Sequence, residues 1–424
     1  MTMTFAHLPT CLALYFAGLA HAAGPPTAPP DELDALALAD KAPVEATQPA
    51  RPWRMFMEGA SGRNEVIGAV SRVDTQRLSV DLRFDASLAP GLRAVLSDRV
   101  DLAHSNGVPP AENVNTLREA YLSWAYSDHR VFELGRVNVR NGVAMGFNPT
   151  DWFKENALRS VVSPDPAVLR ENRQGTVVLQ GQQLWGSGAL TATLSPKLAN
   201  APDPDAFALD FGATNPRTRW LLAGSYKFSD ALNPQLLLYG GADTPTQLGL
   251  NLSALASEAA VVVGEFSVGK GPTLQAKALG LAGADGTQQR ASVGFSYTTG
   301  FNLTFTAAFE YNSAAPKQRQ WLALNPLERL RVLATADAQQ DLPVRQAWFF
   351  HARWEDLLLR RLDVSAFVRR DNETGSRHQW LEARYSWDHA DLSVQWQRFS
   401  GEPGSVFRSV PQRQAVELAL RYYF

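Results

Sequence analysis

The sequence of 424 residues contains one cysteine, Cys11, close to its amino terminus. Leu8-Pro9-Thr10 before this cysteine and Leu12 after it do not fit a lipobox, so the sequence does not predict a lipoprotein. Every later segment is free of cysteine, which excludes disulfides, a thiolate nucleophile and Cys-ligated metals there. An exported chain of this length without disulfides is typical of a Gram-negative envelope protein.

The sequence also lacks an excess of charge of one sign. After the amino-terminal segment it has no long apolar run. The 40 basic and 42 acidic residues give a net charge of −2, which argues against nucleic acid as a partner. No uninterrupted apolar run reaches the length of about 18 residues that a transmembrane helix needs. Aromatic residues are plentiful, with 11 Trp, 10 Tyr and 21 Phe. If the chain is exported, these features leave a periplasmic protein or an outer-membrane barrel.

The amino-terminal segment predicts export. Residues 1–22 carry no Lys, Arg, Asp or Glu, and an apolar run leads to the small-x-small pattern Ala20-His21-Ala22. We therefore predict a signal peptide over 1–22 that is cleaved near Ala22. The Pro/Ala-rich segment 23–50 predicts an extended periplasmic lead-in, and residues 51–424 form the remaining domain.

The last thirteen residues alternate between two kinds of side chain. One parity is apolar and comprises Val416, Leu418, Leu420, Tyr422 and Phe424. The other parity comprises Arg413, Ala415, Glu417, Ala419, Arg421 and Tyr423. A period of two predicts a strand with different surroundings on its two faces. It resembles the closing strand of bacterial outer-membrane barrels, in which the terminal aromatic is part of the signal read by the assembly machinery. The alternative is an ordinary carboxyl-terminal strand of a soluble β-sandwich.

The same alternation recurs from Arg51 onward in segments of about ten residues, with Trp and Tyr near many segment ends. The fold class predicted is all-β, an antiparallel transmembrane barrel in contact with outer-membrane lipid. Short periplasmic turns must alternate with long outer loops, and the segment Thr273 to Gly283 fits this rule only as part of a loop. We count eighteen strands, with sixteen as the alternative. They fall at 53–60, 76–140, 174–195, 218–269, 288–313 and 344–424.

The segment 140–173 is too long and too aromatic for a plain connection, so we predict a partly helical loop that enters and narrows the lumen. Gly142 and Gly146 allow sharp turns, and Asp151 or Thr150 is predicted to cap a short helix through Leu158. The residues assigned to this constriction are Asp151, Trp152, Arg159, Arg170 and Arg173. The alternative is an ordered external cap that never touches solute.

Arginine recurs on the parity predicted to face the lumen. The residues assigned to the lumen wall are Arg77, Arg83, Arg93, Arg99, Arg136, Arg140, Arg345, Arg353, Arg369, Arg384, Arg413 and Arg421. Arginine suits a bidentate grip on carboxylates and phosphates, so a ladder that passes anionic solutes is one interpretation. Facing carboxylates, such as Asp81 and Glu417, support the other interpretation, in which ion pairs brace a wet lumen.

Catalytic motifs are missing from the chain after residue 22. His351 and His378 face inward by parity, but neither has a serine at a recognisable spacing, and no His-x-x-x-His pair or phosphate-binding loop occurs. The sequence therefore predicts no enzyme, no metal site and no cofactor. A barrel-embedded enzyme is the least favoured alternative.

A block of about eighty residues carries a family resemblance. The block comprises R-E-A-Y-L-S-W (118–124), F-E-L-G-R-V-N-V-R-N-G-V-A-M-G-F-N-P-T-D (132–151), L-R-E-N-R-Q-G-T-V-V-L-Q (169–180) and L-S-P-K (194–197). It is similar to large single-chain porin-like barrels of the bacterial outer membrane, including alginate-export-type barrels. The resemblance implies a channel that conducts solutes passively. The alternative is an export conduit for a polysaccharide, with 23–50 docking to a periplasmic or inner-membrane machine.

Overall fold

We describe the protein from a computed structural model. The structure describes residues 51–67, 72–107, 111–229, 231–282 and 285–424. The predicted signal peptide 1–22 and the predicted lead-in 23–50 lie outside the described residues.

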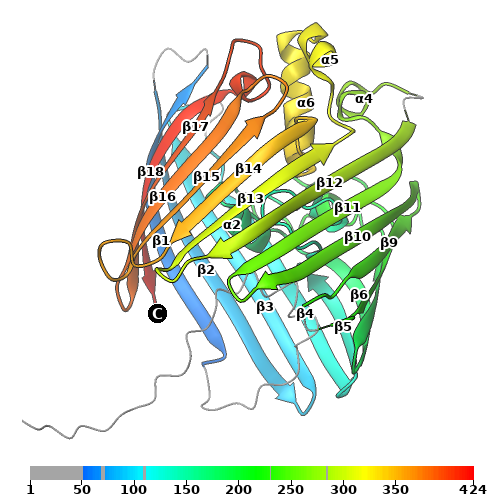
Figure 1. Ribbon diagram of the computed structural model, residues 1–424. Coiled ribbons are helices and arrows are strands. Elements are labelled where there is room, and N and C mark those ends of the chain that lie inside the picture. Colours follow the sequence, from blue (N-terminus) through cyan, green and yellow to red (C-terminus); the bar gives the residue numbers. More distant parts are fainter. Residues whose placement is uncertain (1–50, 68–71, 108–110, 230, 283–284) are drawn as a thin grey trace, which may run out of the picture.

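The chain forms one closed antiparallel barrel (Figure 1). Each strand pairs with its neighbours in sequence, and β1 closes the barrel by pairing with both β2 and β18. The eighteen strands are β1 (Trp53–Val66), β2 (Val73–Ala89), β3 (Leu92–Ser105), β4 (Val114–Ser127), β5 (Arg130–Val137), β6 (Thr176–Trp185), β7 (Gly188–Ser195), β8 (Arg219–Tyr226), β9 (Gln235–Gly241), β10 (Thr244–Ser257), β11 (Ala260–Pro272), β12 (Asp285–Thr298), β13 (Leu303–Asn312), β14 (Gln346–Trp354), β15 (Leu362–Asp371), β16 (Arg377–Ser386), β17 (Ala390–Ser400) and β18 (Gln412–Tyr423). The predicted fold class and the count of eighteen are confirmed.

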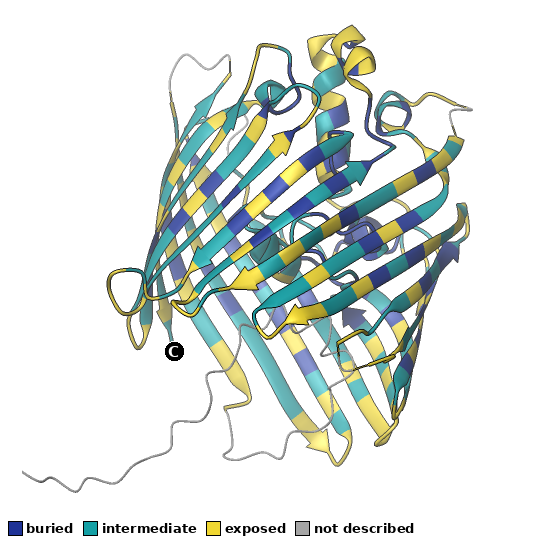
Figure 2. Ribbon diagram, viewed as in Figure 1, coloured by how far each residue is buried: buried dark blue, intermediate teal, exposed yellow. Residues whose placement is uncertain are grey.

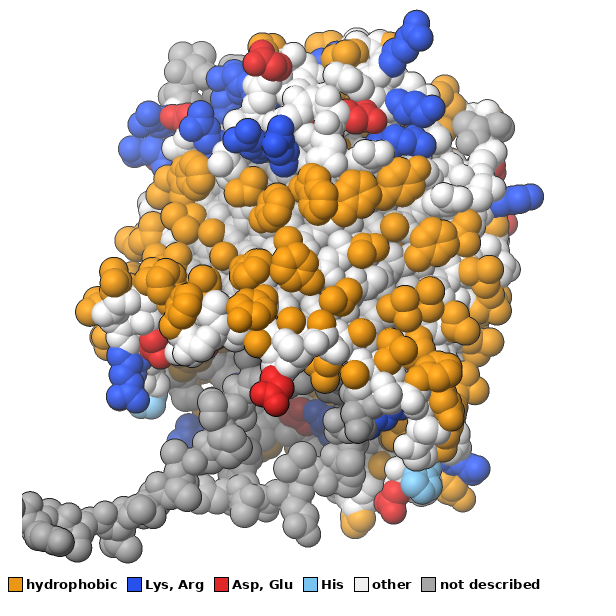
Figure 3. All heavy atoms as spheres, viewed as in Figure 1, with side chains coloured by type: hydrophobic (Ala, Val, Ile, Leu, Met, Phe, Trp, Pro, Cys, Tyr) orange, Lys and Arg blue, Asp and Glu red, His pale blue; other side chains and the backbone are white. Residues whose placement is uncertain are grey.

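Both faces of the barrel follow the period of two (Figure 2). On β18, Leu418 is 49% exposed and points outward, whereas Ala419 beside it is 6% exposed and points inward. Outward apolar residues of this kind occur on strands all around the barrel, and Figure 3 shows the belt that they form on one face. Such a belt is what the hydrocarbon region of a membrane requires of a barrel.

The two edges of the barrel differ. Phe424 donates its backbone N–H to the Met55 carbonyl at 3.1 Å, so the start of β1 and the end of β18 lie at the same edge. The connections at this edge are short, such as Pro90-Gly91 between β2 and β3. We name it the short-turn end. The opposite edge carries the long connections and is named the loop end (Figure 1).

Short helices lie in the long connections. They are η1 (Trp152–Lys154), α2 (Pro166–Glu171), α3 (Phe211–Thr214), α4 (Leu274–Leu279), α5 (Gln318–Ala323), α6 (Pro326–Ala338) and η2 (Phe407–Ser409). The segment Thr273 to Gly283, predicted as part of a loop, contains α4, which the Thr273 hydroxyl caps by accepting the Ala276 N–H at 3.1 Å. Among the residues that the structure describes, no helix is long and apolar enough to cross a membrane.

An apolar core at the loop end holds these connections together. Trp321 of α5 and Val332 of α6 are fully buried and pack with Leu274 of α4 and Phe407 of η2. Phe147, from the connection between β5 and β6, joins the same core. Loop-end segments that are distant in the sequence therefore form one packed layer, and this layer positions the site described next.

Candidate functional site

The connection between β5 and β6, residues 138–175, crosses the interior of the barrel; we name it the crossing loop. On one wall, the Arg118 guanidinium of β4 donates to Asn172 Oδ1 at 3.2 Å. On a distant wall, Gln395 of β17 donates to the Val162 carbonyl at 3.4 Å. Figure 1 shows α2 of this segment within the outline of the barrel. The crossing loop is therefore inside the lumen, as predicted, and is not an external cap.

A buried carboxylate of β11 anchors the start of the crossing loop. Glu265 is 1% exposed and accepts the Ala144 N–H at 2.6 Å and the Asn148 amide at 3.1 Å. Gly142, whose φ of +96° favours glycine, lies so close that a Cβ there would be 2.5 Å from the same carboxylate. Thr150 adds a hydroxyl bond to Asn251 of β10 at 2.8 Å. This tight fit of backbone against the wall fixes the depth of the loop in the lumen.

A second anchor lies on β13 to β15. Arg369 donates to Glu310 at 2.7 Å and to the Gly146 carbonyl at 2.8 Å, and its guanidinium lies 4.9 Å from the centre of the Phe349 ring. A side chain at Gly146 would collide with Glu310 and Phe349, so only glycine lets the loop approach this wall. The arginine thus joins a wall carboxylate to the loop backbone.

The residues predicted for the constriction all hold the loop in place. Asp151 is almost fully buried and pairs with Arg173 at 2.5 Å, and Arg173 also donates to Gln340 after α6 at 2.9 Å. Trp152 donates to Gln247 of β10 at 2.8 Å and stacks on Tyr239 of β9 with 5.0 Å between ring centres.

Two further arginines of this set bind backbone carbonyls. Arg159 donates to the carbonyls of Asn115 and Ala208 at 3.0 and 2.7 Å, and Arg170 donates to the Gly142 carbonyl at 3.3 Å. The Arg159 guanidinium therefore fastens the crossing loop to other segments, whereas Arg170 joins two parts of the loop itself, and both roles are structural.

The predicted helix cap in this loop is wrong. Asp151 precedes the three residues of η1 but makes no capping hydrogen bond, and its carboxylate instead pairs with Arg173. The helix of the loop lies later, at α2, where Asp165 accepts the N–H groups of Ala167 and Val168 at 2.8 and 3.3 Å. The partner that displaced the cap is 22 residues away and gives no local signal.

Two charged residues after Trp152 connect the crossing loop to other loops. Burial would raise the pKa of Glu155, but Lys277 of α4 and Arg217, at 2.7 and 2.5 Å, outweigh it and hold the pKa at about 2. Lys154 is buried and donates to the Asn148 carbonyl at 2.8 Å. Burial lowers its pKa to about 8, although Asp341 and Asp151 oppose that shift.

The lowered pKa of Lys154 makes stability depend on pH. Between pH 8 and 10.5 the unfolded chain holds a proton on this lysine that the folded chain has released, so stability rises with pH in this window. We expect a gain of roughly 1–3 kcal/mol in the free energy of unfolding. Lys154→Met is expected to abolish this gain in urea titrations at pH 7, 8.5 and 10. Equal pH dependence in both proteins would contradict the assignment.

The wall of β18, β1 and β2 is built around a carboxylate that the sequence analysis missed. Glu58 is 5% exposed and pairs with Arg77, Arg421 and Arg99 at 2.6, 2.7 and 3.1 Å. Asp101 supports the cluster by pairing with Arg99 at 2.9 Å. Such dense pairing braces the wall, because each buried charge has partners that compensate for its desolvation.

Five predicted wall arginines remain open to the lumen near the short-turn end; we name them the mouth arginines. They are Arg83, Arg93, Arg353, Arg384 and Arg421. Their side chains are between 22% and 46% exposed and pair with carboxylates such as Glu119, Asp85 and Glu382. Arg54, which the prediction omitted, lies directly opposite Arg83 on the inward face. This end of the lumen therefore presents partly exposed guanidinium groups to the solution.

Four of the predicted wall arginines do not fit a ladder of ion pairs. Arg136 is 2% exposed and donates to the Gly175 and Leu209 carbonyls at 2.9 and 2.6 Å. Arg345 donates to the Ser313 carbonyl at 3.1 Å and lies before β14. Arg140 lies in the crossing loop, beyond the end of β5. Arg413 is exposed at the loop end of β18 and makes no ion pair with a described residue.

In the described part of the chain, no three His, Cys, Asp or Glu side chains are grouped so that they could hold a metal ion. His351 and His378 face inward, His351 is buried and His378 is half-buried, and His378 stacks on Phe399 with 4.2 Å between ring centres. The packing of both rings against aromatic residues is that of core side chains.

Comparison with known proteins gives the fold. No family model matches the chain, and no curated protein matches its sequence. Pseudomonas aeruginosa OccK5 (OpdH) has a similar structure, with a TM-score of 0.56, 10% identity, and coverage of 88% of this chain and 97% of that one. Acinetobacter baumannii OccAB1 gives a TM-score of 0.56 at 11% identity, covering 90% of this chain and 98% of that one.

A third similar structure contains a ligand. P. aeruginosa OccK2 (OpdF), solved in complex with glucuronate, gives a TM-score of 0.52 at 11% identity, covering 88% of this chain and 97% of that one. At identities this low, the structural similarity is evidence for a common fold but not for a common solute or common site residues. The chain has the closed eighteen-stranded barrel fold of these porin structures.

Proposed function

We propose that the protein is a passive channel of the Gram-negative outer membrane. The observation that carries the proposal is a closed barrel with an apolar outer belt, whose lumen contains an anchored crossing loop. A barrel of this width without an inserted segment leaves an open aqueous path, so the crossing loop sets the passage that remains. The similar Occ structures support the proposal, because they have the same fold.

The solutes that we propose are small anions or saccharides. The mouth arginines support this preference, because they leave guanidinium faces exposed to water in the lumen. OccK2 (OpdF) binds glucuronate, a sugar with a carboxylate, and this supports the same class of solute here. Carboxylates pair with each mouth arginine, so we expect a moderate preference rather than strict exclusion of cations.

The selectivity is tested by removing three mouth arginines together. In the variant Arg83→Gln, Arg93→Gln and Arg353→Gln, the carboxylates Asp85, Glu119 and Glu355 remain without their partners. We expect the reversal potential under a KCl gradient in planar bilayers to shift toward cations, because the field of the lumen becomes more negative.

The matched control removes three exposed arginines from the outer surface of β15, β16 and β17 at the loop end, Arg370→Gln, Arg377→Gln and Arg398→Gln. This control changes the net charge equally but leaves the lumen unchanged, so its reversal potential should equal that of the wild type. An unchanged reversal potential in the mouth variant would leave the mouth arginines only a bracing role. Absence of any ohmic current in the wild type would contradict the channel itself.

The remaining predictions from the sequence stay proposals. We propose that the protein has no enzymatic activity, and that the strand ending at Phe424 is read by the barrel assembly machinery. The resemblance to alginate-export-type barrels also stays a prediction. The alternative of a polysaccharide export conduit depends on docking through 23–50, which lies outside the described residues.

A further inference from the structure

Three arginines face outward at the loop end of adjacent strands: Arg370 of β15, Arg377 of β16 and Arg398 of β17. We name them the outer arginine patch. Arg370 lies directly opposite both Arg377 and Trp348, and Arg398 lies opposite Gln379, the next outward residue after Arg377. Trp348 is 43% exposed on the outer surface, and all three arginines are exposed on the same parity. The patch is therefore outside the barrel, away from the lumen.

The patch has no compensating acid. None of the three arginine side chains makes an ion pair or hydrogen bond with any residue that the structure describes, in contrast to the paired arginines of the lumen. Arginines directly opposite each other on neighbouring strands repel, with Cβ atoms about 5 Å apart. Because no carboxylate neutralises Arg370 and Arg377, their guanidinium groups are available to bind an anion from outside the protein.

The three arginines form a group on one side of the barrel. At the same end of β11 to β13, the outward positions carry one basic residue, Lys270, and one acidic residue, Asp285, beside the neutral Thr287, Gln289 and Tyr311. Figure 3 shows a group of basic side chains directly above the apolar belt on the side of β15 to β17. A general requirement for charge at a membrane boundary would apply all around the barrel, so this grouping points to a ligand with a defined position.

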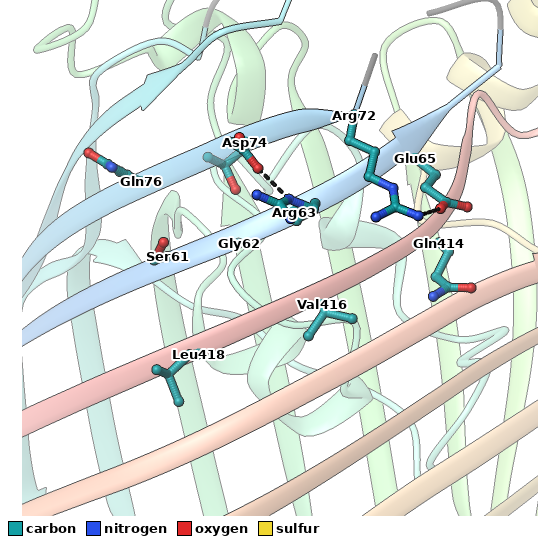
Figure 4. Close-up of a pocket in the computed structure, with 11 residues that line it drawn as sticks. Ser61, Gly62, Arg63, Glu65, Arg72, Asp74, Gln76, Gln414, Val416 and Leu418 are labelled. Atoms are coloured by element: carbon teal, nitrogen blue, oxygen red, sulfur yellow. Dashed lines mark hydrogen bonds and ion pairs between the residues drawn. The ribbon is translucent and has the colours of Figure 1, made fainter.

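Next to the patch, β18, β1 and β2 form a hollow of about 620 Å³ on the outer surface (Figure 4). Its upper rim is polar, with Arg63 paired to Asp74 at 2.6 Å and Arg72 paired to Glu65 at 3.1 Å. Its lower part is apolar, because Val416 and Leu418 of β18 lie there. Gln414 lies opposite Arg398, so the hollow continues the patch sideways at the same height.

We infer that this surface binds the phosphate groups of a phosphorylated lipid in the membrane leaflet at the loop end. Guanidinium groups of the outer arginine patch hold the phosphates, and acyl chains lie along the apolar belt below, past Trp348 and Trp396. The polar hollow accommodates part of the headgroup. A lipid is favoured over free phosphate because the arginines border directly on exposed apolar residues such as Trp348, which lies opposite Arg370. The inference goes beyond the proposed channel but rests on its proposed location in the outer membrane.

The test measures lipid binding by the folded barrel. Purified protein in a non-ionic detergent is titrated with diphosphoryl lipid A, and bound lipid is counted by native mass spectrometry. The patch variant is Arg370→Gln, Arg377→Gln and Arg398→Gln. The matched control, Arg130→Gln, Arg360→Gln and Arg361→Gln, removes the same charge at the short-turn end, where these residues are exposed. We expect the patch variant to bind about tenfold more weakly and the control to bind as the wild type.

Two further measurements separate the alternatives. Lipid A from which the phosphates have been removed should bind wild type and patch variant equally weakly, and millimolar inorganic phosphate should not displace the phosphorylated lipid. Single-channel conductance of the patch variant should equal that of the wild type, which shows that the barrel is folded. Equal affinity of wild type and patch variant for diphosphoryl lipid A would overturn the inference. Full displacement by inorganic phosphate would also overturn it, because the patch would then be a site for free anions.

Discussion

Replacing residues 140–169 with a short Gly/Ser linker is expected to raise the single-channel conductance several-fold. These residues form most of the crossing loop, which contacts walls as far apart as β4 and β17. The linker can be short, because the Asn138 side chain donates to the Arg170 carbonyl at 2.9 Å, so the two ends of the deleted part are close. Without the loop, the lumen has the width of an eighteen-stranded barrel and conducts accordingly.

Conductance is measured in planar bilayers, and heat-modifiable migration on gels shows whether the variant barrel is folded. The control replaces the exposed turn Asp356–Arg361 at the short-turn end with a similar linker, which should leave the conductance unchanged. Leu358 in that turn is 92% exposed and has no role in the lumen wall. If the folded deletion variant conducts like the wild type, the crossing loop does not set the size of the passage.

A graded variant locates the constriction more closely. Glu265→Ala removes the acceptor for Ala144 and Asn148 and leaves the anchor at Arg369 intact. The loop then loses its attachment to β11 and keeps the others, so we expect rapid fluctuations of the current between the wild-type level and higher levels. A steady current at the wild-type level would show that the contact with β11 is dispensable for closure.

The fold was largely predictable from the sequence because strand faces are encoded locally. Leu418 and Leu420 alternate with Glu417 and Ala419, and a period of two needs no knowledge of any other strand. Where the period is broken, parity no longer gives the face of a residue. The register of β3 against β4 shifts between Ser97 and Asp98, so that Arg118 and Glu119, neighbours in sequence, both reach lumen partners, and the predicted lumen wall does not include Arg118.

The wall residues that anchor the crossing loop could not be predicted from the sequence. Glu265 contacts a segment 121 residues earlier in the chain, and no periodicity of β11 marks it as different from the other inward residues. Arg136 was predicted as part of the lumen wall by parity, yet it binds carbonyls of Gly175 and Leu209, because α3 and the crossing loop fold over it. Parity gives the face of a strand, whereas the role of a side chain depends on which loop covers it.

Replacing Glu58 with glutamine is expected to lower the free energy of unfolding by about 3–5 kcal/mol, because it leaves buried guanidinium groups without their acceptor. Arg77, Arg99 and Arg421 all bind this carboxylate, and Arg99 is 3% exposed. In the variant, Arg99 still has an ion pair with Asp101. Arg421 has no ion pair with Asp101, so it loses the carboxylate of Glu58 without a replacement from that residue. Urea unfolding of the barrel from liposomes, followed by tryptophan fluorescence, measures the change.

The same substitution at Glu119 is the matched control. Glu119 forms one ion pair, with Arg83, whose side chain is 30% exposed, so water can replace the lost partner. Glu119→Gln should therefore cost about 1 kcal/mol or less. Combining Glu58→Gln with Arg421→Gln should recover part of the loss, since the partly exposed Arg421 then no longer lacks a partner. Equal effects of Glu58→Gln and Glu119→Gln would show that the wall is held by its strand pairing alone and not by the cluster around Glu58.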